Sequence, residues 1–463
     1  ISSTLKNCRC SFTKPHMPQN TFTGKPFSVA FYTLGCRVNQ YETRAVEEAF
    51  IAKGFVVGSF DEPCDVYVIN TCTVTAESDR KSRQLIRRCR AVSDHVIVTG
   101  CFAEISPDAA KSIDGVDAVI GNKNKSSVID VVKRFAEGSA YRRDDFSEDF
   151  ESFEECGALR GGCAVRARAY VKIEDGCDNR CAYCIIPKAR GPVRSKSPDD
   201  VISEVEALAS SGVCEVILTG IETASYGRDF GNGYGLYELL HDISLIDGIK
   251  RIGMGSLDPS SMRGDFPKRL SALPNVLPHF HISLQSGSSE ILAAMRRRYN
   301  ASQAKALIEN IRSAYDEVTL SCDIIAGFPG ESDKLFSETA EFLREARFLH
   351  IHAFPFSPRE GTEAVSMPDQ VPVEVRRERV RILSSLDEKI RSEILSDYVM
   401  RHRLKEVNVL AEKFADGKLT GHTEHFIETS FEGSENLIGK ICRVTLSETD
   451  AGKCFGVRIA DQP

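Results

Sequence analysis

The sequence predicts an α/β protein with three folded parts: an N-terminal doubly wound parallel sheet, a central partial (β/α)6 barrel and a small C-terminal antiparallel β-barrel. In two stretches, apolar strand segments alternate with helical segments, and this alternation favours parallel sheets. Short strands between glycine turns near the end of the chain favour the small barrel. A chain of 463 residues is also too long for one compact core.

Residues 27–137 carry the first alternation. The expected strands are Phe27–Leu34, Asp65–Asn70, Val96–Thr99 and Ala118–Ile120, and the expected helices include Glu42–Lys53 and Glu77–Arg90. The first strand is a run of aromatic and β-branched residues, which is typical of a buried strand. Residues 1–26 are polar, contain prolines and have no helical or strand period, so we expect a flexible tail and a natural start at Met17.

The second alternation follows an acidic, glycine-containing stretch, residues 138–165, which we interpret as a linker. Residues 166–371 then contain six strand–helix units. The expected strands are Tyr170–Ile173, Glu215–Thr219, Arg251–Ser256, Phe280–Leu284, Val318–Ile325 and His350–Phe356. Six units are fewer than the eight of a closed barrel, so we expect a laterally open barrel with room for a bulky substrate at the carboxyl ends of its strands.

The last part of the chain is connected by a charged amphipathic helix, expected over residues 372–400. Residues 401–463 contain the expected short strands Glu406–Ala411, His425–Ser430 and Cys442–Leu446. About 60 residues of this kind suit a small antiparallel barrel.

The composition excludes several classes of protein. Hydrophobic residues make up 42% and charged residues 27%, as in ordinary globular proteins. No apolar run approaches the roughly 20 residues of a membrane span, so no membrane partner is expected. The net charge of −7 means that a polyanion would have to be bound by local basic patches. Sixteen cysteines in a long chain without a secretory leader favour metal or redox chemistry in a reducing cytoplasm over disulfides.

The strongest chemical signal is the C-x3-C-x2-C group formed by Cys177, Cys181 and Cys184, which follows the first strand of the central barrel. Three thiolates at this spacing can ligate three irons of a [4Fe–4S] cluster and leave the fourth open to chelate S-adenosylmethionine. Tyr183, between the last two ligands, can pack on the adenine. A zinc site is the alternative, but it needs a fourth ligand and usually two C-x2-C pairs.

A second signal depends on the predicted topology. Cys36, Cys72 and Cys101 each come just after the carboxyl end of an expected parallel strand. In an open α/β sheet these ends share one crevice, so we expect the three thiols to converge. Nearby helix N-termini favour the thiolate form. Three thiolates again predict a cluster with one open iron, and the alternative is three buried structural cysteines.

Over about residues 27–463, the sequence resembles the radical-SAM methylthiotransferases. TLGCRVNQYET (33–43), INTCTVT (69–75) and TGCFAE (99–104) are similar to the N-terminal domain of that family, where three cysteines hold an auxiliary [4Fe–4S] cluster. GCDNRCAYCIIPKARG (176–191) is similar to its radical-SAM motif. The final 60 residues resemble its TRAM domain, an RNA-binding barrel, although residues 401–463 carry nine Lys or Arg against ten Asp or Glu.

Within the family, TLGCRVNQYET, MRRRYN (295–300) and HAFPFSPREGT (352–362) resemble one branch most closely. That resemblance implies an enzyme that methylthiolates C2 of N6-threonylcarbamoyladenosine at tRNA position 37, 3′ of the anticodon. It also implies two [4Fe–4S] clusters, S-adenosylmethionine, a sulfur donor, and an electron donor such as flavodoxin or ferredoxin. Lys188 and Glu222 depart from residues that are common in the family.

Three alternative functions remain open at this stage. Two keep the chemistry and change the acceptor, to isopentenyladenosine in tRNA or to an aspartate of a ribosomal protein. The third is of another class, a non-catalytic RNA-binding protein with structural zinc.

Further contacts are expected from polar residues at the tops of the barrel strands. The candidates for S-adenosylmethionine are Gly220, Glu222, Gln285, Ser286, Asp323 and Gly327, all of which are also common turn formers. For the tRNA phosphates we expect a basic cluster that includes Arg87 and Arg88, and a second cluster of Arg296, Arg297 and Arg298. One of these three arginines could instead pair with the threonylcarbamoyl carboxylate. The plain alternative for each basic cluster is a solvated helix face.

Overall fold

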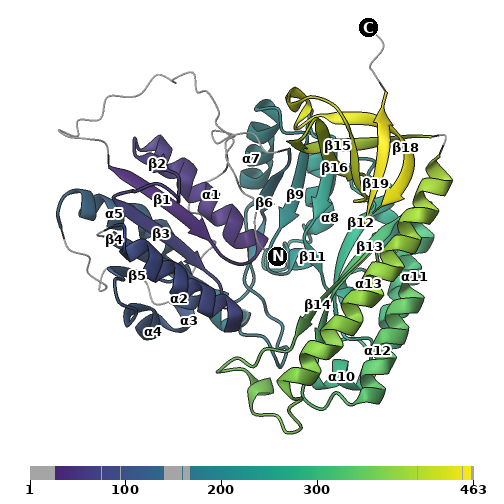
Figure 1. The fold of residues 1–463 in the computed structure, drawn as a ribbon, viewed down its shortest axis with the longest axis horizontal. Helices are drawn as coiled ribbons and strands as arrows, with labels where there is room; N and C mark the ends of the chain where they lie inside the picture. The colour runs from purple at the N-terminus through teal and green to yellow at the C-terminus, as the bar shows by residue number, and fades with distance from the viewer. Residues whose placement is uncertain are drawn as a thin grey trace.

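The computed structural model describes residues 27–73, 76–93, 95–139, 159, 167–403, 405–450 and 452–459, and its domains are arranged as in Figure 1. The expected tail, 1–26, lies outside these residues, as does most of the expected linker, 138–165. None of the helices within the described ranges combines the length and hydropathy that a membrane-spanning segment requires.

The N-terminal domain is a five-stranded sheet in the order β2-β1-β3-β4-β5, and every pair in it is parallel. The strands are β1 (Ser28–Thr33), β2 (Val56–Gly58), β3 (Val66–Thr71), β4 (His95–Gly100) and β5 (Ala118–Ile120). The helices are α1 (Arg37–Ala52), α2 (Ala76–Arg90), α3 (Cys101–Ile105), α4 (Pro107–Lys111) and α5 (Val128–Ala136). The expected doubly wound sheet is confirmed, with the short edge strand β2 in addition.

Both faces of this sheet are buried. Alternate residues of each strand point to opposite sides, and both sets of side chains belong to apolar clusters. Val66 and Val68 of β3 belong to the apolar cluster that includes α1 and α5. Tyr67 and Ile69 of the same strand belong to the cluster that includes α2, α3 and α4. Helices therefore cover the sheet on both faces, and a ligand could reach it only at the strand ends.

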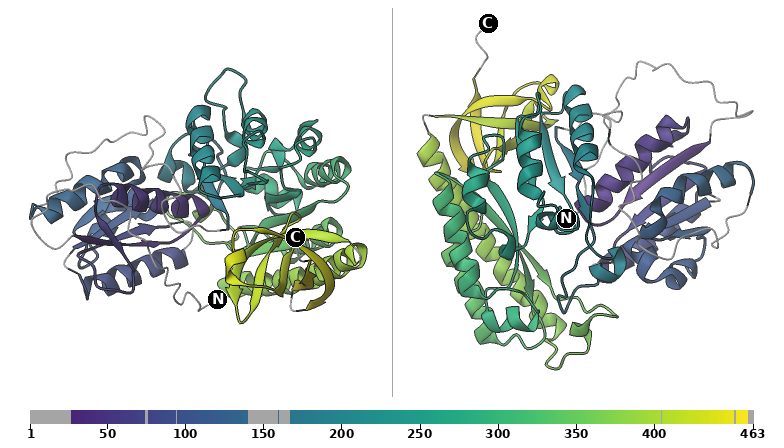
Figure 2. Two further views of the ribbon diagram at one scale, coloured as in Figure 1. Left: turned by 90° about the horizontal axis from the view of Figure 1, so that it is seen from above. Right: turned by 180° about the vertical axis from the view of Figure 1, so that it is seen from behind.

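The central domain is an arc of parallel strands with helices outside it (Figures 1 and 2). Its strands are β6 (Ala169–Lys172), β9 (Glu215–Thr219), β10 (Arg251–Met254), β11 (Ser256–Leu257), β12 (His279–Gln285), β13 (Thr319–Ala326) and β14 (His350–Pro355). Its helices are α6 (Ile186–Arg190), α7 (Pro198–Ser210), α8 (Leu236–Ser244), α9 (Phe266–Ser271), α10 (Ser289–Ala294), α11 (Ala301–Ala314) and α12 (Asp333–Ala346). A short hairpin of β7 (Glu174–Asp175) and β8 (Arg194–Ser195) flanks the arc.

The expected open barrel is confirmed, with one interruption. The single strand expected over Arg251–Ser256 is divided at Gly255 into β10 and β11. β10 pairs with β9, whereas β11 pairs with β12, so the arc changes partner strands at this glycine. A Cβ on Gly255 would lie 2.7 Å from the Thr223 hydroxyl oxygen, which explains why a residue without a side chain stands there.

The C-terminal part consists of the long helix α13 (Val373–His402) and a closed five-stranded barrel. The barrel strands are β15 (Glu406–Ala415), β16 (Lys418–Thr423), β17 (Glu428–Glu432), β18 (Ile441–Asp450) and β19 (Lys453–Arg458). The barrel is not wholly antiparallel as expected. β19 lies between β17 and β18; it is antiparallel to β18, its hairpin partner, and parallel to β17.

The small barrel packs against the amino ends of the central strands. Arg251, the first residue of β10, donates to the carbonyls of Asn408 and His422 at 2.6 and 3.0 Å. His279, the first residue of β12, stacks on Phe426 with ring centroids 4.5 Å apart. The carboxyl ends of the central strands therefore remain on the side away from the small barrel.

Candidate active site

The first cysteine set, Cys36, Cys72 and Cys101, lies at the carboxyl ends of three neighbouring strands. Cys36 caps α1 after β1, Cys72 follows β3, and Cys101 opens α3 after β4. These three strands are adjacent in the order β1-β3-β4. The sheet topology thus brings together residues that are 36 or 29 positions apart in the sequence.

The backbone around this set is closely packed. Gly35 has a φ of +104°, and a Cβ on it would lie 2.7 Å from Cβ of Cys72 and 3.0 Å from its sulfur. The residue before Cys36 must therefore be glycine for the two loops to meet. The side chain of Asn39 ties the same loops, because its Nδ2 donates to the carbonyls of Leu34 and Thr71 at 2.8 and 3.0 Å.

The pKa of the Cys36 thiol depends on burial, on Arg190 of the barrel domain and on Cys101 of the same set. Desolvation by the surrounding protein raises the pKa of the Cys36 thiol, although part of the residue remains exposed, and a charged Cys101 would raise this pKa further. The Arg190 guanidinium has the opposite effect on the pKa. Nδ2 of Asn122 lies 3.5 Å from the Cys101 sulfur and can donate to it.

The second cysteine set, Cys177, Cys181 and Cys184, lies on the loop after β7. The Cys177 amide donates to the Gly191 carbonyl, and the Cys184 amide donates to the Cys181 carbonyl, both at 3.0 Å. Gly176 has a φ of +85°, and a Cβ there would lie 1.8 Å from the Pro192 carbonyl oxygen. Only glycine fits this position, so the loop closes directly in front of its first cysteine.

Two thiols of the second set, Cys177 and Cys184, do not ionise readily by themselves. Burial raises the pKa of Cys177 to about 11 and that of Cys184 to about 12. Without a metal these thiols are protonated at neutral pH, whereas bound irons would convert them to thiolates. Among the described residues, no three or more His, Cys, Asp or Glu side chains are arranged to hold one metal ion. The thiolates of a cubane each bind a different iron, and such ligands are spaced more widely than those of a single ion.

A cavity of about 280 Å³ adjoins the second set. Tyr183, Cys184, Gln285 and Asp323 line it together with apolar residues of β14 and α6. Gln285 has a φ of +67°, an uncommon backbone conformation for a residue with a side chain. Three of the residues expected to contact S-adenosylmethionine therefore share one cavity with a cysteine of the set.

The other expected contacts lie elsewhere. Ser286 is fully buried and its hydroxyl pairs with that of Thr339 at 3.1 Å. Gly327 packs against α13, where a Cβ would lie 2.5 Å from the Arg376 side chain. These two residues are held in the packing behind the cavity and do not line it.

Gly220 and Glu222 follow the end of β9 and lie next to the buried carboxyl group of Glu174. A Cβ on Gly220 would lie 2.2 Å from Oε1 of Glu174, and the Glu222 amide donates to the same oxygen at 2.5 Å. Burial and the neighbouring Asp258 raise the pKa of Glu222 to about 7. This carboxyl adds to the electrostatic surroundings of Cys177, whose pKa it raises.

The three consecutive arginines point in different directions. Arg296, with a φ of +58°, is exposed and pairs with Glu363 at 2.7 Å, and Arg298 is also exposed. Arg297 is largely buried and donates to Asp258 at 2.6 Å and to the Cys181 sulfur at 3.3 Å. Arg297 is therefore placed at the second cysteine set, and only its two neighbours are available to a large external ligand.

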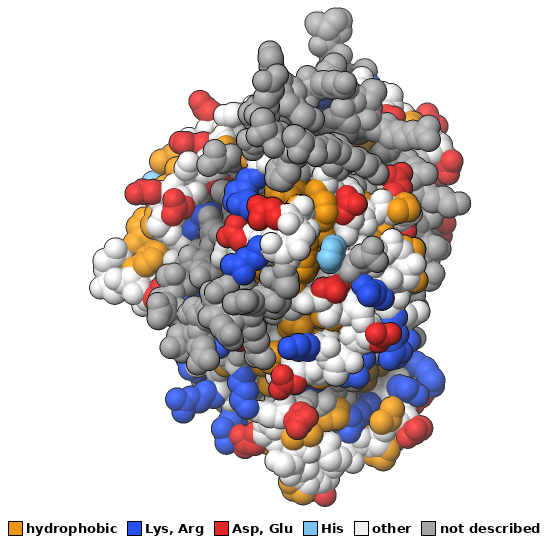
Figure 3. Space-filling view, turned by 90° about the vertical axis from the view of Figure 1, so that its left-hand side faces the viewer, with side chains coloured by type: hydrophobic (Ala, Val, Ile, Leu, Met, Phe, Trp, Pro, Cys, Tyr) orange, Lys and Arg blue, Asp and Glu red, His pale blue; other side chains and the backbone are white. Residues whose placement is uncertain are grey.

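The basic residues of α2 are on the surface. Arg87 and Arg88 are exposed, and Arg88 pairs with Asp61 at 3.2 Å. Figure 3 shows the molecule from the side of the N-terminal domain, with Lys and Arg side chains most numerous in its lower half and Asp and Glu between them.

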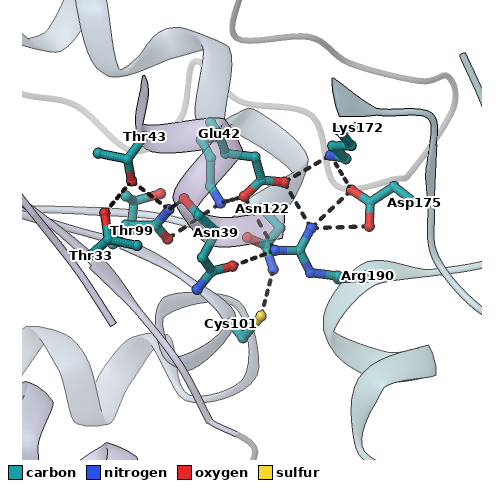
Figure 4. A network of polar contacts seen from close by, with 12 residues as sticks. Thr33, Asn39, Glu42, Thr43, Thr99, Cys101, Asn122, Lys172, Asp175 and Arg190 are labelled. Carbon is teal, nitrogen blue, oxygen red and sulfur yellow. Dashed lines mark hydrogen bonds and ion pairs between the residues drawn. The ribbon is translucent and has the colours of Figure 1, made fainter. Parts of the chain in front are cut away.

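A buried polar network, which was not expected from the sequence, lies between the two cysteine sets (Figure 4). Its members are Asn39, Glu42, Lys125, Lys172, Asp175 and Arg190. Asn39 and Glu42 lie within TLGCRVNQYET. Asp175 comes just before GCDNRCAYCIIPKARG, and Arg190 lies within it. The signal that could have found them is their position in the segments that carry the cysteines.

Comparisons with known proteins agree with this architecture. A model of the radical SAM superfamily matches residues 171–343, and a model described as the uncharacterized protein family UPF0004 matches residues 28–121. Among solved structures, the radical S-adenosylmethionine methyltransferase TsrM from Kitasatospora setae, with cobalamin and a [4Fe–4S] cluster bound, is similar with a TM-score of 0.55. The identity is 14%, with 86% of this chain and 81% of that chain covered, so this likeness concerns the fold alone.

Several curated proteins are similar over nearly their whole length. Threonylcarbamoyladenosine tRNA methylthiotransferase MtaB from Bacillus subtilis (strain 168) is 36% identical, with 90% of this chain and 93% of that protein covered. The protein of the same name from Aquifex aeolicus (strain VF5) is 36% identical, with 90% and 100% covered. The tRNA-2-methylthio-N(6)-dimethylallyladenosine synthase from Oceanobacillus iheyensis is 32% identical, with 97% and 87% covered. The chain therefore belongs to the radical-SAM methylthiotransferase family, whose members are enzymes that use S-adenosylmethionine and [4Fe–4S] clusters.

Proposed function

We propose that this protein adds a methylthio group to C2 of N6-threonylcarbamoyladenosine at position 37 of tRNA. The acceptor follows from the relatives named for threonylcarbamoyladenosine, which reach 36% identity over 90% of this chain, whereas those named for dimethylallyladenosine reach 34% over 79% of it. The proposed chemistry requires the two cysteine sets to act together, and the observation that carries it is the contact between the segments that hold them. Arg190, which follows the second set, donates to Asn39, which follows Cys36 of the first set, at 2.6 Å.

Each cysteine set would hold one [4Fe–4S] cluster. Cys177, Cys181 and Cys184 would hold the cluster that works with S-adenosylmethionine, and Cys36, Cys72 and Cys101 would hold an auxiliary cluster. When bound, these groups supply radical chemistry at the second set and sulfur chemistry at the first. The protein's own contribution is to supply three thiols to each group and to keep the fourth position free.

The cavity beside Cys184 is the proposed S-adenosylmethionine site. Tyr183 would face the adenine, and Gln285 and Asp323 offer polar groups to the ribose or aminoacyl part. Glu222 and Gly220 would contribute from the end of β9, on the side of Cys177. Ser286 and Gly327 would support this site through packing.

The tRNA would be bound by exposed cations and by the small C-terminal barrel. Arg296 and Arg298 near the second set, and Arg87 and Arg88 on α2, are exposed and can approach phosphates. The adenosine itself would have to leave its stack to reach the strand ends. We further infer a cytoplasmic protein that takes electrons from a donor such as flavodoxin or ferredoxin and sulfur from a separate donor.

Nucleoside mass spectrometry of tRNA from a strain lacking this gene tests the acceptor. We expect methylthiolated threonylcarbamoyladenosine to disappear, its unmethylthiolated precursor to accumulate, and the wild-type gene to restore the product. A strain that lacks the methylthio form of isopentenyladenosine instead would refute the proposed acceptor.

Metal analysis tests the cluster assignment. Anaerobically reconstituted protein should contain about eight irons and as many sulfides, the content of two cubanes. The Cys181→Ala variant should keep about four irons and lose cleavage of S-adenosylmethionine. Retained cleavage in this variant, or zinc without sulfide in the wild type, would contradict the assignment.

A further inference from the structure

One arginine lies between the two cysteine sets. Arg190 is the last residue of α6, six positions after Cys184, and its side chain is completely buried. Helix α6 leads out of the loop that carries the second set, and Figure 4 shows the guanidinium between this segment and the N-terminal domain. Arg190 is therefore close in sequence to the second cysteine set and lies at the boundary with the domain that carries the first.

The guanidinium binds acceptors on both sides of the domain boundary. In the N-terminal domain, it donates to the Glu42 carboxylate at 2.8 and 3.2 Å and to Oδ1 of Asn39 at 2.6 Å. In the barrel domain, it donates to both oxygens of Asp175 at 3.0 Å. Asn39 follows Cys36 by three positions, and Asp175 precedes Cys177 by two. One side chain thus joins segments that are close to a cysteine of each set.

The backbone beside Arg190 makes a second connection. The Ala189 carbonyl accepts a hydrogen bond from Nδ2 of Asn122 at 2.9 Å, and this nitrogen is the one that lies 3.5 Å from the Cys101 sulfur. Asn39 in turn donates to the Thr71 carbonyl, directly before Cys72. All three cysteines of the first set are therefore connected, through one asparagine or the other, to Arg190 or its neighbour.

The charges around Arg190 keep the contact ionic. Burial alone would raise the pKa of Glu42, but Arg190, Lys125 and Lys172 outweigh it and hold this pKa well below its usual range. Asp175 is likewise paired with two cations, since Arg190 donates to both of its oxygens at 3.0 Å and Lys172 donates to Oδ2 at 2.8 Å. Both carboxylates are ionised, and buried ions depend on the close approach of their partners. The network therefore restricts how far the two domains can shift at this point.

We propose that Arg190 is a positioning residue that fixes the first cysteine set relative to the loop carrying the second. Its catalytic consequence rests on the proposed function, because both sets must then act on one nucleoside. The placement itself does not depend on the identity of the substrate. Without the guanidinium, only Lys172 still bridges Glu42 and Asp175, at 2.8 Å from each, so the contact across the boundary is weaker and the domains should separate locally.

A spectroscopic experiment tests the placement without any substrate. The full-length Arg190→Gln and Arg190→Lys variants are reconstituted anaerobically, both clusters are reduced, and the spin–spin interaction between them is measured by EPR. We expect about eight irons in every sample, a weaker interaction in Arg190→Gln, and partial recovery in Arg190→Lys, which keeps the charge. The control is Arg251→Gln, which removes another buried arginine, at the interface with the small barrel, and should leave the interaction unchanged.

A second readout uses the ratio of methylthiolated nucleoside to 5′-deoxyadenosine. In Arg190→Gln we expect this ratio to fall about tenfold to 100-fold, the cost of a small misplacement of reacting groups, while 5′-deoxyadenosine still forms. An unchanged EPR interaction in Arg190→Gln overturns the proposal, and so does a parallel loss of both products. Glu42→Gln, which is nearly isosteric and acts from the other domain, decides in the same way where Arg190→Gln does not fold. If the wild type modifies another nucleoside, only the proposed function fails, because the EPR result still decides the placement.

Discussion

Replacing Arg297 by glutamine should lower the reduction potential of the cluster proposed on the second cysteine set. Nη1 of Arg297 lies 3.3 Å from the Cys181 sulfur and donates to it. A cationic hydrogen-bond donor at a ligand sulfur stabilises the extra negative charge of the reduced cluster, and hydrogen bonds to sulfur are one determinant of its potential. The glutamine amide would remove the positive charge from this contact.

The size of the effect follows from Coulomb's law. At the observed Nη1–Sγ distance of 3.3 Å and an effective dielectric constant of about 20, two unit charges interact with about 5 kcal/mol. The added electron is spread over a four-iron cluster, so roughly a quarter of this energy, about 1.2 kcal/mol, applies at one corner. For a one-electron couple, this energy corresponds to a fall in potential of about 50 mV. The buried Asp258 carboxylate, left without its partner at 2.6 Å, acts in the same direction.

The assay is an EPR-monitored redox titration in a background in which Cys36, Cys72 and Cys101 are alanines, so that a single cluster is observed. The matched control is Arg296→Gln, because the neighbouring Arg296 is exposed and pairs with Glu363. A midpoint potential in Arg297→Gln equal to that of this control would refute the reasoning.

Other substitutions test the packing and charge of the site. Gly176→Ala should prevent the loop from closing, because its Cβ would lie 1.8 Å from the Pro192 carbonyl oxygen, and iron analysis should find about four irons rather than eight. The pKa of Glu222 is raised to about 7, so the folded protein binds the proton more tightly, and its free energy of unfolding should decrease as the pH rises from 4.5 to 7, by at most about 3.4 kcal/mol. In Glu222→Gln, urea midpoints should lose this slope, and a slope that persists would count against the assignment. Tyr41→Phe removes a hydroxyl that donates to Glu204 at 3.0 Å, and urea unfolding should show a loss of about 1 kcal/mol, whereas no change would mean that the contact is not formed.

The fold was predictable where strands are apolar and buried. The expected β9 over Glu215–Thr219 matches the structure at both ends, and all of its residues are buried. β2 was missed because it has only three residues, and β16 and β19 were missed because polar residues interrupt their apolar positions. The parallel contact of β17 with β19 could not be predicted, since it depends on how the barrel closes and not on the pattern of either strand.

The placement of Cys36, Cys72 and Cys101 at one edge of the sheet could be predicted from the sequence, because topology alone brings parallel strand ends together. The directions of the three arginines could not. Arg296 adopts a left-handed φ of +58° directly after the end of α10, and this turn directs Arg297 into the protein while its neighbours stay exposed. A run of identical cations gives no indication of such a turn.

The network around Arg190 shows why the two motifs have to be considered together. Glu42 and Arg190 are separated by 148 positions, and each by itself is a charged helical residue that a sequence pattern assigns to solvent. Burying an ion without a partner costs about 3–5 kcal/mol, and two of the cationic partners of Glu42, Lys172 and Arg190, come from the barrel domain. TLGCRVNQYET and GCDNRCAYCIIPKARG each supply cysteines and one half of this ionic contact. The residues between and after the cysteines therefore have a role of their own, because they determine where the two motifs meet, and a substitution there can uncouple two complete cysteine sets.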